Sequence, residues 1–430
     1  MSQPTMKRVV SRWPIVAVSL NDVIGSGVYL LPAAATALLG PASVWAVAAA
    51  GLAVLLVVLC FAEAATHFDE PGSAYLYAKT AFGNAVGFQV GWMAWITRVA
   101  AEASLAAGFA QALAFLWPAA DEGLGRVFVV GGAIIGLYLI NLVGVQMGTG
   151  ASVVLTIAKL VPLAVFIVVG AASFSWERMI GQEATGEGTL GAAVLLLLYA
   201  YAGFENTAAA AGEFKNPKRD VPFALLTQIA LVTSVYVLVQ AVALGTLDSL
   251  ATSQSPIAEA SRLLLGPAGG LLLTVGAAIS ILGTTANSVF AGPRYLFALA
   301  KDGYFPAPLG RVHPRFRTPA AALGLQTLIA LPLALTGSFV HLATLSVVAR
   351  LATYLSTAAA VPVLRRKMPT PAEGSFRLPG GPLIPIAACV MGLIFAASAT
   401  VQNLLAAAAA LVVGAVIYLL NARHRTSHSG

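Results

Sequence analysis

The sequence contains, at Val23-Ile24-Gly25-Ser26-Gly27-Val28-Tyr29-Leu30-Leu31-Pro32, two glycines and a serine inside an apolar segment long enough to cross a bilayer. In hydrocarbon every backbone N–H and C=O group must be paired, so a spanning helix is interrupted only where the freed groups face protein, water or a ligand. The stretch predicts either a broken helix with a binding site or an unbroken helix with a small-residue packing face. A break would present carbonyls near Ile24 and amides near Ser26, and these partial charges match a zwitterion.

The composition of the 430-residue chain is that of a membrane protein. Hydrophobic residues make up 59% of the sequence and charged residues 10%, and the mean hydropathy is +0.86. Such a chain has too little polar surface to cover a soluble globule of its size. We attribute the net charge of +7 to cytoplasmic loops and not to nucleic-acid binding. The 2 cysteines lie in apolar runs, so neither a disulfide framework nor a metal cluster is expected.

Hydropathy windows of about 19 residues predict twelve transmembrane helices. Most Lys and Arg residues fall in loops on the same side as the N-terminus, and the opposite loops hold only Arg126, Arg178 and Arg262. Because positive charge accumulates in cytoplasmic loops, we expect a multi-pass protein of the cytoplasmic (inner) membrane with both termini in the cytoplasm. The basic residues left within spans, where a charge is costly, are Arg98, Lys159 and Arg350.

A second glycine with a polar neighbour lies in the sixth predicted span, in Tyr199-Ala200-Tyr201-Ala202-Gly203-Phe204-Glu205-Asn206. Because five is an odd number, two repeats of five spans would have opposite orientations in the membrane. Paired broken helices in an inverted repeat are typical of secondary transporters, which bind their substrate at the breaks.

Four segments carry a family resemblance. They are GSGVYLLP in the first span, FAEAATHFDEPGSAYLYAKTAFG after the second, AGFEN with GEFKNPKRDVPFAL around the sixth, and RYLFALAKDGYFP after the eighth. In this order and at these positions, they resemble the amino acid, polyamine and organocation (APC) superfamily of permeases. The resemblance implies amino acids or related amines as substrates.

The resemblance also implies an all-α membrane fold of the leucine-transporter type. It has a five-plus-five inverted repeat, broken helices 1 and 6, and two extra helices at the C-terminus. We therefore expect a cytoplasmic tail at 1–13, the first repeat at 14–173, the second at 189–367, the additional helices at 382–421 and a cytoplasmic tail at 422–430.

The substrate is expected where the two predicted breaks meet. The amides of Ser26 and Gly27 would bind its carboxylate, as both the helix dipole and the resemblance indicate. Its ammonium would meet carbonyl groups at the end of the first half-helix and in the sixth span. The candidate substrate-binding residues are Val23, Ile24, Gly25, Ser26, Gly27, Tyr199, Ala202, Gly203 and Phe204.

The side chains near the breaks predict the class of substrate. An apolar and aromatic set lies there, consisting of Val23, Ile24, Tyr199, Tyr201 and Phe204. A further unpaired charge among these side chains would be costly. We therefore expect a neutral amino acid, small or aliphatic, in preference to a charged one. By resemblance Phe204 covers the substrate as a gate, and ordinary packing is the alternative.

The candidates for proton coupling are Lys159, Glu205 and Asp22. By resemblance, Lys159 stands beside the place where sodium-coupled members of the broader fold bind a sodium ion, and its ammonium can replace the charge of that ion. Burial disfavours the charged form of a lysine, so this residue would gain and lose a proton. The alternative is a permanently charged lysine with a structural role, which holds the carbonyl groups of the first helix. Thr284 and Thr285 are the hydroxyls expected to contact it or the substrate.

The other charges within spans leave alternatives open. Glu205 would be paired, protonated or facing water. Similar arginine/agmatine exchangers carry an acid at the matching place, which suggests a role in proton sensing; a purely structural hydrogen bond is the alternative. Asp22 would pair with Lys159, bind the substrate ammonium or cap the broken helix. Arg98 and Glu102 are at i and i+4 on one helix face, so we expect an ion pair between them.

The sequence favours a secondary active transporter over an enzyme or a channel. It has no G-x-x-x-x-G-K-[ST] segment for ATP, no spanning helix with two histidines at metal-ligand spacing and no repeated pore loop. We expect a permease that moves amino acids by alternating access and proton-coupled symport, with exchange or export by the same fold as the alternative. The expected partners are the substrate, protons and the lipid bilayer, without a cofactor, a metal or nucleic acid.

Overall fold

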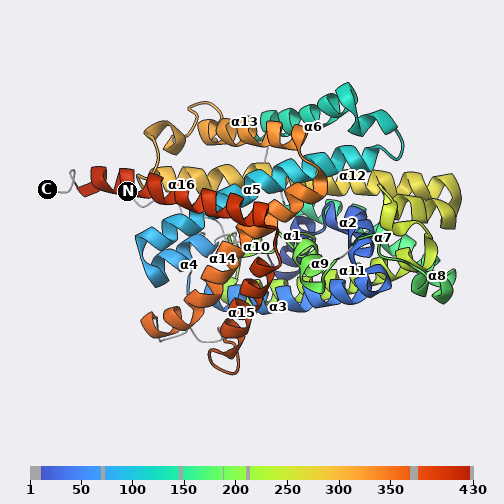
Figure 1. Cartoon of the computed structure of the whole chain (residues 1–430). Helices are drawn as coiled ribbons and strands as arrows, with labels where there is room; N and C mark the ends of the chain where they lie inside the picture. Colours follow the sequence, from blue (N-terminus) through green and yellow to red (C-terminus); the bar gives the residue numbers. More distant parts are fainter. Residues whose placement is uncertain are drawn as a thin grey trace.

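The structure, a computed structural model, describes residues 11–68, 73–144, 149–186, 188–209, 214–368 and 376–426. Within these ranges the chain folds into helices and contains no β-strand (Figure 1). Among the same residues, 7 helical stretches are long and apolar enough to cross a membrane. Two shorter apolar helices, α13 (Ala320–Thr336) and α15 (Leu383–Ala397), accompany them.

The N-terminal part of the chain begins with two helices separated by three residues. Its helices are α1 (Arg12–Val23), α2 (Gly27–Leu39), α3 (Ser43–Thr66), α4 (Ser73–Phe82), α5 (Asn84–Leu113), α6 (Gly123–Val143) and α7 (Thr149–Ala172). Gly83 separates α4 from α5 with a φ of +88°, in the left-handed region that glycine tolerates without a steric penalty.

The second part of the chain also contains an interruption, at residues 198–204. Its helices are α8 (Trp176–Ile180), α9 (Leu190–Leu197), α10 (Glu205–Ala209), α11 (Pro217–Thr246), α12 (Pro256–Lys301), α13, α14 (Phe339–Lys367), α15 and α16 (Val401–Thr426). This interruption lies between α9 and α10, and the first interruption, at residues 24–26, lies between α1 and α2. Helix α12 is kinked at Gly266, where φ is +68°. Short 3₁₀ turns occur at η1 (Gly40–Ala42), η2 (Pro118–Asp121), η4 (Leu250–Thr252) and η5 (Ala307–Gly310).

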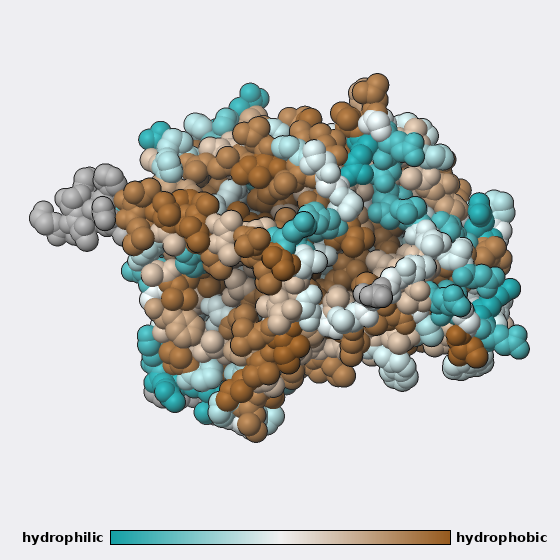
Figure 2. All heavy atoms as spheres, in the orientation of Figure 1, coloured by the Kyte–Doolittle hydropathy of each residue, from teal (hydrophilic) through white to brown (hydrophobic). Residues whose placement is uncertain are grey.

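The interrupted helices lie in the middle of the molecule (Figure 1). Helix α1 packs on α7 and α11, α5 packs on α12 and α14, and α6 pairs with α13 along one edge of the view. The outer helices are largely uncovered: only 17% of the apolar window of α6 and 11% of that of α16 is buried, against 67% for α14. Figure 2 shows apolar side chains over α15 and α16, as expected for helices that face lipid.

Candidate functional site

The two interruptions approach each other so closely that glycine is needed at both. Gly203 has a φ of +125°, and a Cβ built on it would lie 2.5 Å from the carbonyl oxygen of Asp22. A Cβ on Gly27 would lie 2.6 Å from the Cα of Ala200. Real Cβ contacts do not reach these distances, so the glycines of each stretch make room for the backbone of the other.

Lys159 of α7 is fully buried and holds the carbonyl end of α1. Its Nζ donates hydrogen bonds to the carbonyl oxygens of Asn21 at 2.7 Å and Ile24 at 2.9 Å, and to Thr284 Oγ1 at 3.2 Å. An ammonium group has three donors, and all of them are used here. Lys159 therefore donates to carbonyl groups at the end of α1 that have no hydrogen-bond donor within the helix. Its expected contact with Thr284 is present.

The carbonyl of Ile24 is already occupied, which corrects its expected role in binding the substrate ammonium. Besides Lys159, its oxygen accepts hydrogen bonds from Ser280 Oγ at 2.9 Å and Thr284 Oγ1 at 3.2 Å. A carbonyl oxygen has two lone pairs, so no acceptor site is left. Thr285 also departs from its expected role, because its hydroxyl donates to the carbonyl of Ile281 in its own helix at 2.7 Å.

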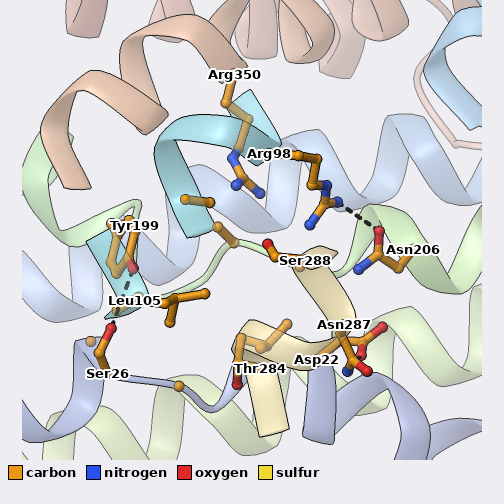
Figure 3. Close-up of a pocket in the computed structure, with 17 residues that line it drawn as sticks. Asp22, Ser26, Arg98, Leu105, Tyr199, Asn206, Thr284, Asn287, Ser288 and Arg350 are labelled. Carbon is orange, nitrogen blue, oxygen red and sulfur yellow. Dashed lines mark hydrogen bonds between the residues drawn. The ribbon is translucent and has the colours of Figure 1, made fainter. Parts of the chain in front are cut away.

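A cavity lies between the two interruptions and the helices α5, α12 and α14 (Figure 3). Most of the candidate residues of the two interruptions line it: Asp22, Val23, Gly25, Ser26, Gly27, Tyr199, Ala202 and Gly203. The remaining wall includes polar side chains that the sequence analysis did not assign to the substrate: Arg98, Asn206, Asn287, Ser288 and Arg350. Asn287 and Ser288 follow Thr284 and Thr285 in the polar run GTTANS. This run of polar residues within a span could have indicated that they face the cavity.

Phe204 and Tyr201 do not line the cavity, which corrects the predicted apolar and aromatic lining. The ring of Phe204 packs against Phe61 and Tyr354, with centroids 5.3 and 5.4 Å apart. The hydroxyl of Tyr201 donates to the carbonyl of Val47 at 2.9 Å. Phe204 therefore packs in an aromatic cluster, and of the predicted apolar set only Val23 and Tyr199 reach the cavity.

One end of the cavity carries the start of α2. Ser26 and Gly27 lie there, where a helix has its partial positive charge. The hydroxyls of Ser26 and Tyr199 are 3.3 Å apart (Figure 3). Tyr236 of α11 donates to the carbonyl of Ala200 at 3.0 Å and lies 3.4 Å from that of Val23, which ties both interruptions to α11.

Glu205, at the start of α10, is held between two arginines. Arg98 Nη2 is 3.2 Å from Glu205 Oε1, and Arg350 Nη1 donates to the same oxygen. The backbone N–H of Gly203 donates to the other oxygen at 3.1 Å, and Arg98 also donates to Asn206 Oδ1 at 2.6 Å. All three charged side chains are buried. This charged cluster of Arg98, Glu205 and Arg350 joins α5, α10 and α14.

The charged cluster lies between two cavities. Arg98 and Arg350 line the central cavity and also a second, smaller one, whose wall includes Ser73, Thr97 and Glu205. Ser73 Oγ donates to the carbonyl of Glu205 at 3.2 Å, so α4 is tied to α10 at this point.

The predicted ion pair between Arg98 and Glu102 is wrong. Arg98 turns to Glu205 and Asn206, and Glu102 accepts a hydrogen bond from Gln326 Nε2 of α13 at 2.7 Å. Asp22 has a partner that was not among its three alternatives, since its carboxylate accepts a hydrogen bond from Asn287 of α12.

Comparison with known proteins matches almost the whole chain to one family. Residues 10–422 match the family model described as amino acid permease. The chain is 29% identical over 409 residues to the serine/threonine exchanger SteT of Bacillus subtilis (strain 168), covering 92% of each chain. It is 28% identical over 438 residues to the methylthioribose transporter of that organism, covering 97% of this chain and 94% of the relative.

The branched-chain amino acid permease BcaP of the same organism is 26% identical over 450 residues, covering 98% of this chain and 94% of the relative. All three names describe transport proteins. The matched residues include both interruptions, Lys159 and the charged cluster. Because the match covers almost the whole chain, the chain belongs to the amino acid permease family.

Proposed function

We propose that this chain is a secondary active transporter that moves neutral amino acids across the cytoplasmic membrane by alternating access, coupled to protons. Its helices would form twelve spans with both termini in the cytoplasm. The repeats would be 14–173 and 189–367, with two further helices at 382–421 and broken helices at the first and sixth spans. The main support for the proposal is the position of Lys159, whose ammonium binds the carbonyl end of α1.

The geometry of the cavity supports an amino acid as the substrate. The amides at Ser26 and Gly27 would bind the carboxylate, as at other helix N-termini that bind anions. Asp22, Val23 and Ala202 line the same cavity and would face the ammonium. Two of the relatives are named for amino acids without a charged side chain, which favours a neutral substrate. Because SteT is named as an exchanger, exchange is the second candidate mode.

The contacts of Lys159 support coupling to protons in preference to sodium. A sodium ion at this place would need oxygen ligands from α1, α7 and α12, and an ammonium within hydrogen-bonding distance of the same oxygens would repel it. Loss of a proton would remove a positive charge and one donor from the end of α1. That change would bias the equilibrium between inward- and outward-facing states by the difference in their interaction with Lys159.

The test is uptake of a radiolabelled neutral amino acid into proteoliposomes that carry an imposed proton or sodium gradient. We expect accumulation when the outside is more acidic than the inside, and none from a sodium gradient. Lys159→Ala should lose this accumulation and keep exchange of substrate down its own gradient. Lys215→Ala removes an exposed lysine and serves as the matched control. Sodium-driven accumulation, or an unchanged pH response in Lys159→Ala, would refute the coupling.

Glu205 is the second candidate for the proton-carrying group, and Glu205→Gln belongs in the same experiment. Two buried arginines share its carboxylate, so its protonation would remove the negative charge that both of them contact. We expect Glu205→Gln to lower both uptake and stability, while the remaining uptake keeps its pH response. If the pH response disappears in Glu205→Gln and persists in Lys159→Ala, the coupling site lies at α10.

A further inference from the structure

We propose that Arg350 of α14 and Ser288 of α12 select substrates whose side chain is neutral and carries a hydroxyl or carboxamide oxygen. This inference rests on the proposed transport of amino acids through the central cavity, and it narrows the class of substrate. It replaces the expectation of an aliphatic side chain, because most of the apolar lining on which that expectation depended lies elsewhere.

The wall formed by α5, α12 and α14 presents polar groups to the substrate side chain. Figure 3 shows the guanidinium groups of Arg98 and Arg350 directed toward the cavity, with Ser288 beside them and Ser26 at the far end. A substrate whose carboxylate is at Ser26 would therefore extend its side chain toward the arginines.

Two groups on this wall have hydrogen-bonding capacity that the protein does not use. Ser288 is only 2% exposed, yet within the described part of the chain its hydroxyl makes no hydrogen bond. Arg350 is 3% exposed; its Nη1 donates to Glu205, and the Tyr354 side chain also contacts its guanidinium. Its Nε is buried and has no hydrogen-bond partner among the residues that the structure describes. Buried donors without acceptors are costly, so a ligand that supplies an acceptor gains affinity.

A neutral side chain with an oxygen satisfies these groups better than the alternatives. A hydroxyl can accept a hydrogen bond from Arg350 and donate one to Ser288, and a carboxamide offers the same pair of functions. An aliphatic side chain would cover the donors and leave them unpaired.

The charges on the wall argue against an ionised side chain. Glu205 already lies between Arg98 and Arg350, and Asp22 faces the cavity from α1. The two arginines and these two carboxylates balance in formal charge. A second carboxylate would therefore compete with Glu205, and a cation would lie beside two guanidinium groups.

The experiment compares threonine with valine, which have nearly the same shape and differ by the hydroxyl. Uptake of each radiolabelled amino acid is measured in proteoliposomes that contain the full chain. We expect the uptake efficiency, Vmax/KM, to favour threonine by at least about 10-fold, the range for a hydrogen bond to a charged group. Asparagine against leucine provides a second pair, and glutamate and arginine are included as competitors.

Two variants test the two residues. Ser288→Ala should lower the threonine-to-valine ratio by about 3- to 10-fold through a higher KM for threonine. Arg350→Lys keeps a positive charge beside Glu205 but removes the planar set of donors, and it should lower the ratio as well. Ser261→Ala is the matched control. Ser261 is also a buried serine of α12, its hydroxyl has no partner in the described ranges of the chain, and it does not line the cavity.

The outcomes separate this inference from the proposed function. Valine taken up as efficiently as threonine, a ratio unchanged in Ser288→Ala, or stronger competition by glutamate or arginine than by threonine would overturn the inference and leave amino acid transport standing. The threonine-to-valine ratio of the wild type and that of Ser288→Ala test the inference even if Arg350→Lys fails to fold. No uptake of any amino acid in the panel would overturn the proposed function itself.

Discussion

At the scale of single residues, the centre of the molecule depends on glycines that touch the opposite interruption. Gly203 needs both its positive φ and the absence of a side chain, whereas Gly27 needs only the space. Gly25 is less constrained, because a Cβ there would meet Thr284 at 3.2 Å, a distance that a small shift relieves. The three glycines therefore differ in how far they tolerate replacement.

Gly203→Ala and Gly27→Ala should each abolish uptake and lower the stability of the folded protein. A left-handed backbone costs a non-glycine residue about 1–3 kcal/mol, and the contact with Asp22 adds to that cost at Gly203. Gly25→Ala should retain part of its activity. The measurements are thermal unfolding in detergent and uptake in proteoliposomes.

Gly136→Ala in α6 is the control for these variants, since a Cβ there meets nothing within 4 Å. Normal uptake by correctly inserted Gly203→Ala would contradict the close approach of the two interruptions.

At the scale of elements, α16 packs on α5 and α14, and two side chains of α5 donate hydrogen bonds to its backbone. Trp92 Nε1 donates to the carbonyl of Ala410 at 2.7 Å, and Gln89 Nε2 donates to that of Leu411 at 3.2 Å. Gly414 lies against the same two side chains, and a Cβ there would be 2.6 Å from each. The apolar window of α16 is only 11% buried, so this close contact is one of few that hold the helix against the scaffold.

Gly414→Leu should weaken the packing of α16 without altering the cavity. Overpacking a close contact costs about 1–3 kcal/mol, which thermal unfolding in detergent would detect. The KM for threonine should stay unchanged, because none of the α16 side chains that the structure describes lines the central cavity. Gly136→Leu places the same side chain in open space on α6 and should leave both measurements unchanged. A large rise in KM in Gly414→Leu would mean that α16 influences the site.

At the scale of the whole molecule, the distribution of basic residues determines the proposed orientation. Arg315 lies in the basic segment before α13, and Glu177 lies in the short helix α8. Both residues are exposed, and the orientation places Arg315 in the cytoplasm and Glu177 outside.

Labelling of single cysteines tests this orientation. In a background that carries Cys60→Ala and Cys389→Ala, a membrane-impermeant maleimide should label Glu177→Cys in intact cells. It should label Arg315→Cys only after permeabilisation. The background without cysteines gives the baseline, and the reverse pattern of labelling would overturn the proposed orientation.

The sequence by itself determined the class of the protein and located the two glycine-containing stretches that could break their helices. The place of Lys159 beside the first helix was an expectation from the family resemblance. The class depends on composition, and the two stretches are glycines in apolar segments; both are properties that can be read locally along the chain. The family also followed from segments that can be read along the chain, and the match over residues 10–422 confirmed it.

Only the tertiary structure decided which buried groups pair and which side chains face the cavity. Arg98 pairs with Glu205 and not with Glu102, because the contacts of a spanning residue depend on how its helix is rotated against its neighbours. The same reason explains why Phe204 faces Phe61 while Ser288 and Arg350 face the cavity. Helical periodicity places residues on a common face, but the packing of the other helices determines what that face meets.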